Sequence, residues 1–229
     1  MHDRIKIILG FVVVLLWNSS VQCQPMQGIY DEAMEFGQPE TAQADRLVID
    51  DFEEPSKLNL LHGMTNVYLM APSRVMSSTA VDERDSTKTV VLKLKFQRFG
   101  EGGPYGKGGW CGYYSAVKEM LKTGTKYFDA TNYTYLTLWV RGEIGGENFI
   151  LGMSDKHWDK AGDTVKSNQI IAYLPEKKIT TKWQQARVPL SDFMLDLSKL
   201  ASIAISFERE CFPDGIGDGV VYIDDIAFE

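Results

Sequence analysis

The feature that most constrains the fold of this chain is a series of short apolar segments that recurs from Arg46 to the C-terminus. In 88–99, "KTVVLKLKFQRF", and 133–142, "YTYLTLWVRG", apolar and polar residues alternate, as they do in a β-strand with one buried face. The segments between them, such as "RGEIGGEN" and "FPDGIGDG", are rich in turn residues. Further strands are expected at 46–54, 148–155, 169–174, 183–190, 200–208 and 219–228.

Helical periodicity is weak, and the short helix candidates are 114–124 and 191–200. Many short strands joined by turns predict an all-β fold, and we expect a two-sheet antiparallel β-sandwich of jelly-roll type. Residues 46–229 are enough for one hydrophobic core and too few for two comfortable domains. The polar segment 24–45 has no sustained period and is expected to be a flexible arm.

Residues 1–23 have the layout of a secretory signal peptide. Basic residues precede the apolar run 7–17, which is shorter than the roughly 20 residues that a membrane span needs. We expect cleavage after Cys23, so that Gln24 becomes the N-terminus of a secreted, extracellular or periplasmic protein. A lipoprotein would keep Cys23 as its anchor, but Gln22 fits poorly the small residue that precedes a lipidated cysteine.

Loss of the signal peptide removes Asp3, Arg4 and Lys6, and the formal charge changes from −7 to −8. An acidic chain without a run of Lys and Arg is poorly suited to nucleic acid or to an anionic membrane surface. We therefore expect neither as a partner.

The cysteines that remain after cleavage are Cys111 and Cys211. An even pair in an oxidising compartment favours a disulfide between them. The alternative is two separate buried thiols, since bonding requires that the two Cα atoms come close together in the fold.

Residues 102–115, "GGPYGKGGWCGYYS", combine glycines with a lysine, a cysteine and aromatic rings. They are not a phosphate-binding loop, because the sequence has no GK[ST] ending and no strand–loop–helix context there. The histidines of the mature chain are His62 and His157, and neither lies in a recognisable catalytic setting. The motifs HExxH and GxSxG are also absent. The sequence predicts a domain that is not an enzyme.

Two acidic clusters lie near the ends of the expected domain, "IDDFEE" at 49–54 and "YIDDIAFE" at 222–229. If the first and last strands pair, these like charges approach one another, which is destabilising unless a cation lies between them. Ca²⁺ suits such a site, because it binds carboxylate and carbonyl oxygens. The alternative is charge that protects a sheet edge from aggregation.

Three segments resemble the calcium-binding jelly-roll carbohydrate-binding modules: "LVIDDFEE" at 47–54, "KWQQARVPLSDF" at 182–193 and "VYIDDIAF" at 221–228. The likeness is to the family 11 type and its relatives with the galactose-binding-like fold, and the complex I intermediate-associated protein family has similar motifs. The resemblance covers Arg46 to Glu229, and its motifs are more specific for the fold than for the ligand. It implies that Trp183 belongs to the core.

The resemblance also implies a structural Ca²⁺ ion. By analogy with such modules, Glu53 and Asp224 hold the ion, and Asp51 and Asp225 are further ligands. Backbone carbonyls of the loop 82–88, "DERDSTK", would complete the coordination.

Aromatic residues are the candidate sugar contacts, because their faces stack on pyranose rings while polar neighbours bond the hydroxyls. In strand 133–142, Trp139 and Arg141 lie opposite an apolar stripe and face outward if that stripe faces the core. Ordinary packing is the alternative for every candidate. The other candidates are Asp155, His157 and Trp158 on a loop at 152–163, and Trp110, Tyr113 and Tyr114 in the glycine-rich stretch.

The sequence therefore predicts an exported, non-catalytic module that binds a polysaccharide or other glycan and holds a structural calcium ion. One alternative is a jelly roll with a structural or protein-binding role. Another is a glycan-acting enzyme, which would need two carboxylates across a cleft. The sequence gives no expectation for the oligomeric state.

Overall fold

A computed structural model describes residues 45–54, 56–103, 106 and 108–229 of the chain. These residues belong to a compact unit, Thr41–Glu229. The expected signal peptide at 1–23 lies outside the described residues, as does the expected arm at 24–45 apart from its last residue. Within the described ranges, no helix is long and apolar enough to cross a membrane.

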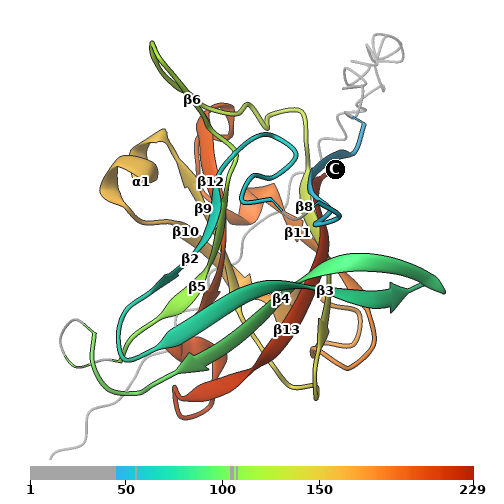
Figure 1. Cartoon of the computed structure of the whole chain (residues 1–229). Coiled ribbons are helices and arrows are strands. Elements are labelled where there is room, and N and C mark those ends of the chain that lie inside the picture. The colour runs from blue at the N-terminus through green and yellow to red at the C-terminus, as the bar shows by residue number, and fades with distance from the viewer. Residues whose placement is uncertain (1–44, 55, 104–105, 107) are drawn as a thin grey trace, which may run out of the picture. The chain divides into compact units, whose positions relative to one another are not determined.

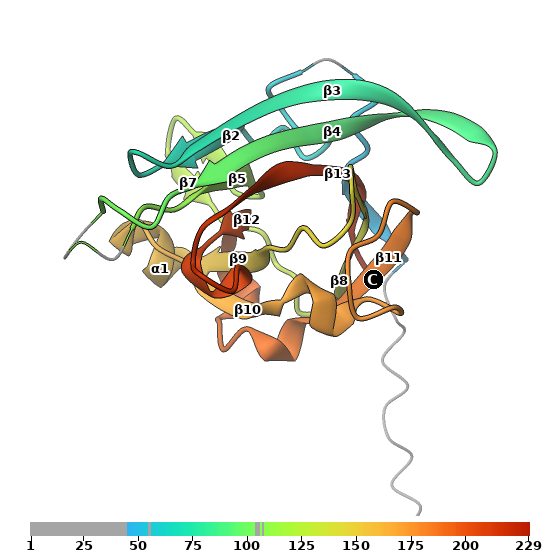
Figure 2. The same cartoon turned by 90° about the horizontal axis from the view of Figure 1, so that it is seen from below.

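Two antiparallel sheets lie against each other and form the fold (Figures 1 and 2). The larger sheet has the order β11-β8-β13-β4-β3, and β1 pairs with β13. Its strands are β1 (Leu47–Asp50), β3 (Arg74–Arg84), β4 (Thr87–Arg98), β8 (Tyr135–Gly142), β11 (Gln184–Pro189) and β13 (Gly217–Phe228). The smaller sheet has the order β10-β9-β12-β5-β2. Its strands are β2 (Thr65–Leu69), β5 (Cys111–Ala116), β9 (Ile150–Asp155), β10 (Val165–Gln169) and β12 (Leu200–Phe207). The predicted two-sheet antiparallel jelly roll is confirmed.

Short elements connect the strands, and three expectations about them are wrong. The expected helix at 191–200 is two separate 3₁₀ turns, at 190–192 and 197–199. The expected helix at 114–124 is the end of β5 followed by a small hairpin, β6 (Glu119–Leu121) and β7 (Gly124–Lys126), because β5 pairs along its length with β2 and β12. The expected strand at 169–174 turns into the 3₁₀ helix η2 (Ile170–Tyr173). The remaining elements are α1 (Lys156–Ala161), η3 (Leu190–Asp192), η4 (Leu197–Lys199) and η5 (Arg209–Cys211).

The main core lies between the sheets and contains the apolar stripes that the sequence predicts. Leu92, Leu94 and Phe96 of β4 are all buried, and so are Leu136, Leu138 and Val140 of β8. The ring of Phe96 stacks on that of Phe207 of β12, with 3.8 Å between the centroids, and so joins the two sheets. Each such side chain contributes about 1.5–3 kcal/mol when it is fully buried.

A second, smaller apolar cluster lies on the outer face of the larger sheet. It contains Val91, Val220 and Tyr222, against which Ala80 and the half-buried Trp183 pack. Trp183 therefore packs in this outer cluster and not in the main core between the sheets.

The predicted disulfide between Cys111 and Cys211 is wrong: both cysteines are free and buried. Cys111 belongs to the core between the sheets and lies near the backbone of β3 and β4. Cys211 lies in η5, beyond the end of β12, with its Sγ 3.9 Å from the carbonyl oxygen of Ser206. The two thiols thus have separate surroundings, which is the alternative that the sequence left open.

A count of free thiols checks this arrangement in a Cys23→Ser variant. Unfolded in denaturant without reductant, the variant should react with a thiol reagent at both Cys111 and Cys211. In the folded protein the reaction should be slow, because burial raises the pKa of Cys111 to about 11 and that of Cys211 to about 12, and the thiolate is the reactive form. A complete lack of reactive thiols after unfolding would instead indicate the disulfide.

Candidate functional site

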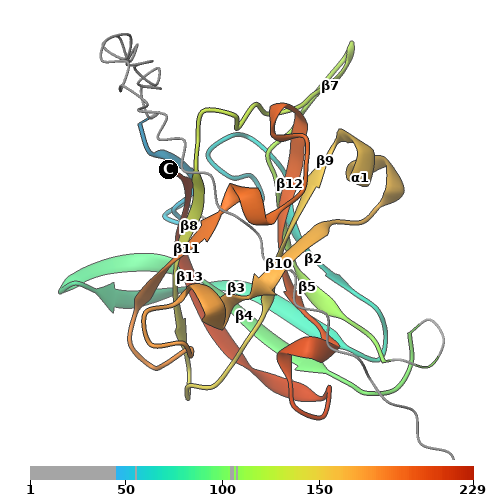
Figure 3. The same ribbon diagram turned by 180° about the vertical axis from the view of Figure 1, so that it is seen from behind.

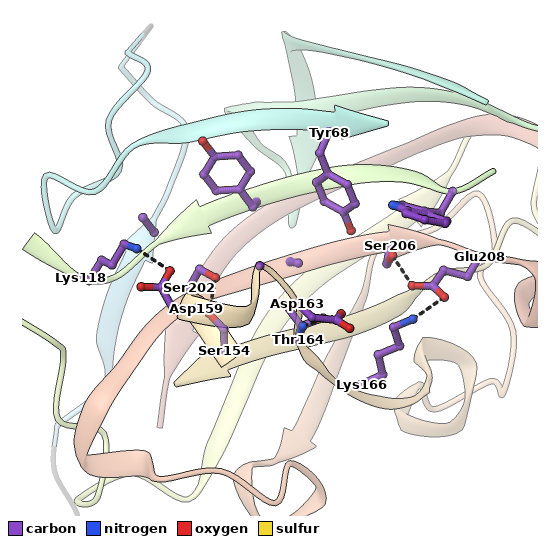
Figure 4. Close-up of a pocket in the computed structure, with 15 residues that line it drawn as sticks. Tyr68, Lys118, Ser154, Asp159, Asp163, Thr164, Lys166, Ser202, Ser206 and Glu208 are labelled. Atoms are coloured by element: carbon purple, nitrogen blue, oxygen red, sulfur yellow. Dashed lines mark hydrogen bonds and ion pairs between the residues drawn. The ribbon is translucent and has the colours of Figure 1, made fainter. Parts of the chain in front are cut away.

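The outer face of the smaller sheet carries a hollow of about 640 Å³, which we call the groove. This volume falls within the range of about 300–1,000 Å³ that is usual for small-molecule sites. Figure 4 shows how its side chains surround the floor. The residues that line the groove are Tyr68, Trp110, Tyr114, Ala116, Lys118, Ser154, Asp159, Gly162, Asp163, Thr164, Lys166, Ser202, Ala204, Ser206 and Glu208.

Strand alternation produces the floor of the groove. On β12, Ile203, Ile205 and Phe207 face the core, so the residues between them face outward. Those outward residues are small: Ser202, Ala204 and Ser206. Since a strand rises about 3.3 Å per residue, the floor extends about 13 Å along β12.

Serine hydroxyls follow this floor. The Oγ atoms of Ser154 and Ser202 lie 2.7 Å apart, on the neighbouring strands β9 and β12. The hydroxyl of Ser206 donates to Glu208 at 2.7 Å. The floor is therefore low and polar, with hydroxyls that already have partners and fixed directions.

Three aromatic residues form one wall of the groove. Tyr114 is part of β5, Trp110 directly precedes it, and Tyr68 comes from the adjacent strand β2, opposite Gly112. All three are half-buried. Tyr68 extends across β5, and its hydroxyl donates to the carbonyl oxygen of Ile205 on β12 at 3.4 Å. Burial raises the pKa of Tyr68, which keeps this hydroxyl protonated.

Gly112 is the residue that lets the Tyr68 ring lie so close to the sheet. A Cβ atom at this position would lie 2.5 Å from the Tyr68 hydroxyl and 2.1 Å from the carbonyl oxygen of Ile205. Contacts this short do not occur, so the wall depends on a glycine here.

Two ion pairs stand at the two ends of the floor, one beside Ser202 and one beside Ser206 (Figure 4). Lys118, which follows β5, binds Asp159 of α1, and Lys166 of β10 binds Glu208 at 2.6 Å. The hydroxyl of Tyr127 lies 3.4 Å from the second oxygen of Asp159. Each carboxylate is thus held in place by a lysine and keeps further acceptor capacity toward the groove.

The structure separates the predicted glycan contacts into three groups. Trp110 and Tyr114 line the groove, whereas Tyr113 points to the opposite face of β5 and is buried in the core. Asp155 is the N-cap of α1 and accepts from the backbone N–H groups of His157 and Trp158. His157 and Trp158 stand on α1 outside the groove lining, and their rings meet edge to face with 5.5 Å between the centroids.

The third group, Trp139 and Arg141, lies on the other sheet. Both side chains leave β8 on the outer face, as expected, but this is the larger sheet and not the one that carries the groove. Their faces are already covered by neighbours. The guanidinium of Arg84 lies 5.1 Å from the Trp139 ring centre, and that of Arg141 lies 3.9 Å from the Tyr222 ring centre.

The predicted calcium ligands Asp51, Glu53, Asp224 and Asp225 form an acidic corner where β1 meets β13. Their oxygens are bonded to donors of the protein: Arg84 binds both Asp224 and Asp225. Glu53 accepts from the hydroxyl of Thr89 at 2.7 Å and from the backbone N–H of Val90 at 3.0 Å. The last contact lowers the pKa of Glu53.

As arranged, this donor set does not fit Ca²⁺, which takes six to eight oxygen ligands. Across the described ranges, no group of three or more His, Cys, Asp or Glu side chains is positioned to hold a metal ion. Calcium binding stays a prediction.

Comparison with known proteins identifies relatives of the fold. A family model described as carbohydrate binding domain 30 matches residues 65–229. A family 11 carbohydrate-binding module from Clostridium thermocellum, solved with a β-1,3-1,4-mixed-linked tetrasaccharide, superposes with a TM-score of 0.54 at 14% identity, covering 80% of this chain and 94% of that one. A family 30 module of a cellulosomal cellulase from the same organism gives 0.52 at 19% identity, covering 80% and 96%. No curated protein matches the chain in sequence.

Sequence reasoning missed Tyr68 and the two ion pairs of the groove. A signal for the floor was present in 200–208, "LASIAISFE", where small residues alternate with large apolar ones. The partners of Tyr68 and of the lysines come from distant strands and have no signal in the local sequence.

The close approach at Gly112 yields a stability prediction. Gly112→Ala should lower the free energy of unfolding by about 1–3 kcal/mol, because the methyl group overpacks the contact with Tyr68 and β12. Urea unfolding measures the difference. The matched control is Gly100→Ala, whose Cβ would meet only side-chain atoms of Ile216 at 3.1 and 3.2 Å. Equal losses in the two variants would show that Gly112 has no special role.

Proposed function

Because the chain belongs to the carbohydrate-binding domain 30 family, we propose that the groove binds a segment of a polysaccharide chain. The observation that carries this proposal is the composition of the groove. Three aromatic rings form one wall, serine hydroxyls follow the floor, and a lysine-paired carboxylate stands at each end of the floor.

The aromatic wall and the polar groups of the groove match the two kinds of surface that a pyranose ring presents. The C–H face of the ring is apolar and stacks on aromatic side chains, while the hydroxyls around its edge need donors and acceptors. In the groove, Trp110 and Tyr114 are placed to take the apolar face, and Asp159 and Glu208 to accept from hydroxyls. A chain bound in this way lies over the floor of β12.

The side chains of the groove are largely fixed before a ligand arrives, which favours binding. Tyr68 is bonded to β12, and Asp159 and Glu208 are each held by a lysine. Side chains that are already ordered lose little entropy on association.

We infer that the domain binds and does not cleave its ligand. Of the three carboxylates that line the groove, Asp159 and Glu208 are engaged with lysines, and Asp163 accepts from the backbone N–H of Thr164. The family itself is described as a carbohydrate-binding domain. A β-glucan is the first ligand class to test, because the family 11 structure holds a mixed-linked tetrasaccharide. Release of reducing ends from such a glucan by the purified domain would contradict the binding-only function.

We also propose that the protein is exported. Support comes from the apolar run at 7–17 that follows basic residues. N-terminal sequencing of the protein recovered from its native host should give Gln24 as the first residue. Recovery of the intact N-terminus from inside the cell would contradict export.

Affinity electrophoresis in gels that contain soluble polysaccharides tests the groove directly. The wild-type protein should be retarded by a β-glucan, and Trp110→Ala and Tyr114→Ala should each weaken the apparent affinity by at least about tenfold, since aromatic anchors dominate binding energy.

Trp158→Ala and Trp139→Ala are matched controls, because each removes a half-buried tryptophan that lies outside the groove. Both should run like the wild type. Loss of retardation in these controls, with retention in the groove variants, would move the site to another face. Uniform mobility of the wild type on every polysaccharide would favour a structural or protein-binding jelly roll.

A further inference from the structure

The acidic corner is organised around the guanidinium of Arg84. Arg84 ends β3, one residue before the turn at Asp85 and Ser86, and its side chain is 18% exposed. Its Nη1 binds Asp224, and its Nη2 binds Asp225 at 2.6 Å. We propose that this guanidinium takes the place of a metal ion at the acidic corner, so that the fold needs no Ca²⁺ there.

A break in strand alternation brings the two carboxylates to one guanidinium. Consecutive residues of a regular strand point to opposite faces, so Asp224 and Asp225 would ordinarily diverge. Here the register of β13 against β8 shifts between Asp224 and Ala227, and Asp225 has a φ of 52°. This bulge turns Asp225 toward the side of Asp224, and the two carboxylates then need a common cation.

Arg84 has the shape that this pair requires. Its planar fork offers separate N–H groups to two carboxylates, which a lysine ammonium cannot do with the same geometry. The Trp139 ring lies 5.1 Å from its central carbon and holds the guanidinium from one side. Asp224 is only 1% exposed, so its charge depends on this partner.

Other protein donors also contact carboxylates of the corner. The Thr89 hydroxyl lies 2.7 Å from Glu53 and 3.2 Å from Asp224. It therefore links the segment that follows β1 to β13. Arg46 lies 3.7 Å from Asp225 and adds a second positive charge. The contacts of the corner thus come from residues of the chain itself. This inference does not rest on glycan binding.

Thermal unfolding in EDTA and in millimolar Ca²⁺ tests the proposal. The wild type should melt at the same temperature in both. Arg84→Gln removes the charge and should melt about 4–8 °C lower in EDTA, because it leaves a buried carboxylate without its partner. Ca²⁺ should raise the melting temperature of this variant, since the freed carboxylates of Asp224, Asp225 and Glu53 are suitable ligands.

Arg187→Gln is the matched control. Arg187 also lies on the larger sheet, with its guanidinium 4.3 Å from the Tyr135 ring centre and 3.4 Å from Glu229, but its side chain is 51% exposed. Its loss should change the melting temperature by no more than about 2 °C and should create no response to Ca²⁺.

Three results would overturn the proposal. A wild-type melting temperature that rises in Ca²⁺ and falls in EDTA would mean that a metal ion is needed beside Arg84. An Arg84→Gln variant as stable as the wild type would make the arginine dispensable. A destabilised variant that Ca²⁺ does not raise would reduce Arg84 to an ordinary ion pair. If Arg84→Gln does not fold, the wild-type comparison decides.

Discussion

The structure depends on burial of the apolar face of each central strand between the two sheets. On β12 this burial places Ile203, Ile205 and Phe207 in the core, where Phe207 stacks on Phe96 of the opposite sheet. The residues between them must then face outward, and they are small. The hollow therefore lies on the outer side of the smaller sheet, away from the core. Figure 3 shows the two sheets from behind. A change that disturbs the core face of β12 therefore also disturbs the groove floor.

Two departures from regular strand geometry give the molecule its distinctive sites. At Gly112 the lack of a side chain lets Tyr68 cross β5 and bond to β12, which builds the aromatic wall. At the bulge of β13, Asp224 and Asp225 turn toward one guanidinium. Both sites use side chains from distant parts of the chain, and each links strands that are not neighbours in sequence.

The sequence predicted the fold well and the site only partly, for physical reasons. Alternation is local, so the stripes of β4 and β8 and the sandwich they imply could be read directly. Alternation does not say which outer face is hollow, however, and Trp139 and Tyr114 therefore looked equally suitable as sugar contacts. The structure separates them, because small residues meet on β12 beside Tyr114, while Arg84 covers Trp139.

Other features depend on tertiary positions that the sequence does not show. An even number of cysteines suggested a disulfide, but Cys111 and Cys211 have separate environments. The acidic segments suggested calcium ligands, and the arginine that binds Asp224 and Asp225 came from the segment 82–88, which we had expected to supply only carbonyls. Pairing between residues so far apart in sequence leaves no local pattern to detect.

The most direct test of the central claim is the response of the tryptophan indole N–H signals in an NMR titration with a mixed-linked β-glucan oligosaccharide. Trp110 lines the groove, whereas Trp139 and Trp183 lie on the outer face of the other sheet and Trp158 stands on α1. The account predicts that the Trp110 signal moves with increasing ligand while the other three remain in place. Movement of the Trp139 and Trp183 signals with a stationary Trp110 would contradict it.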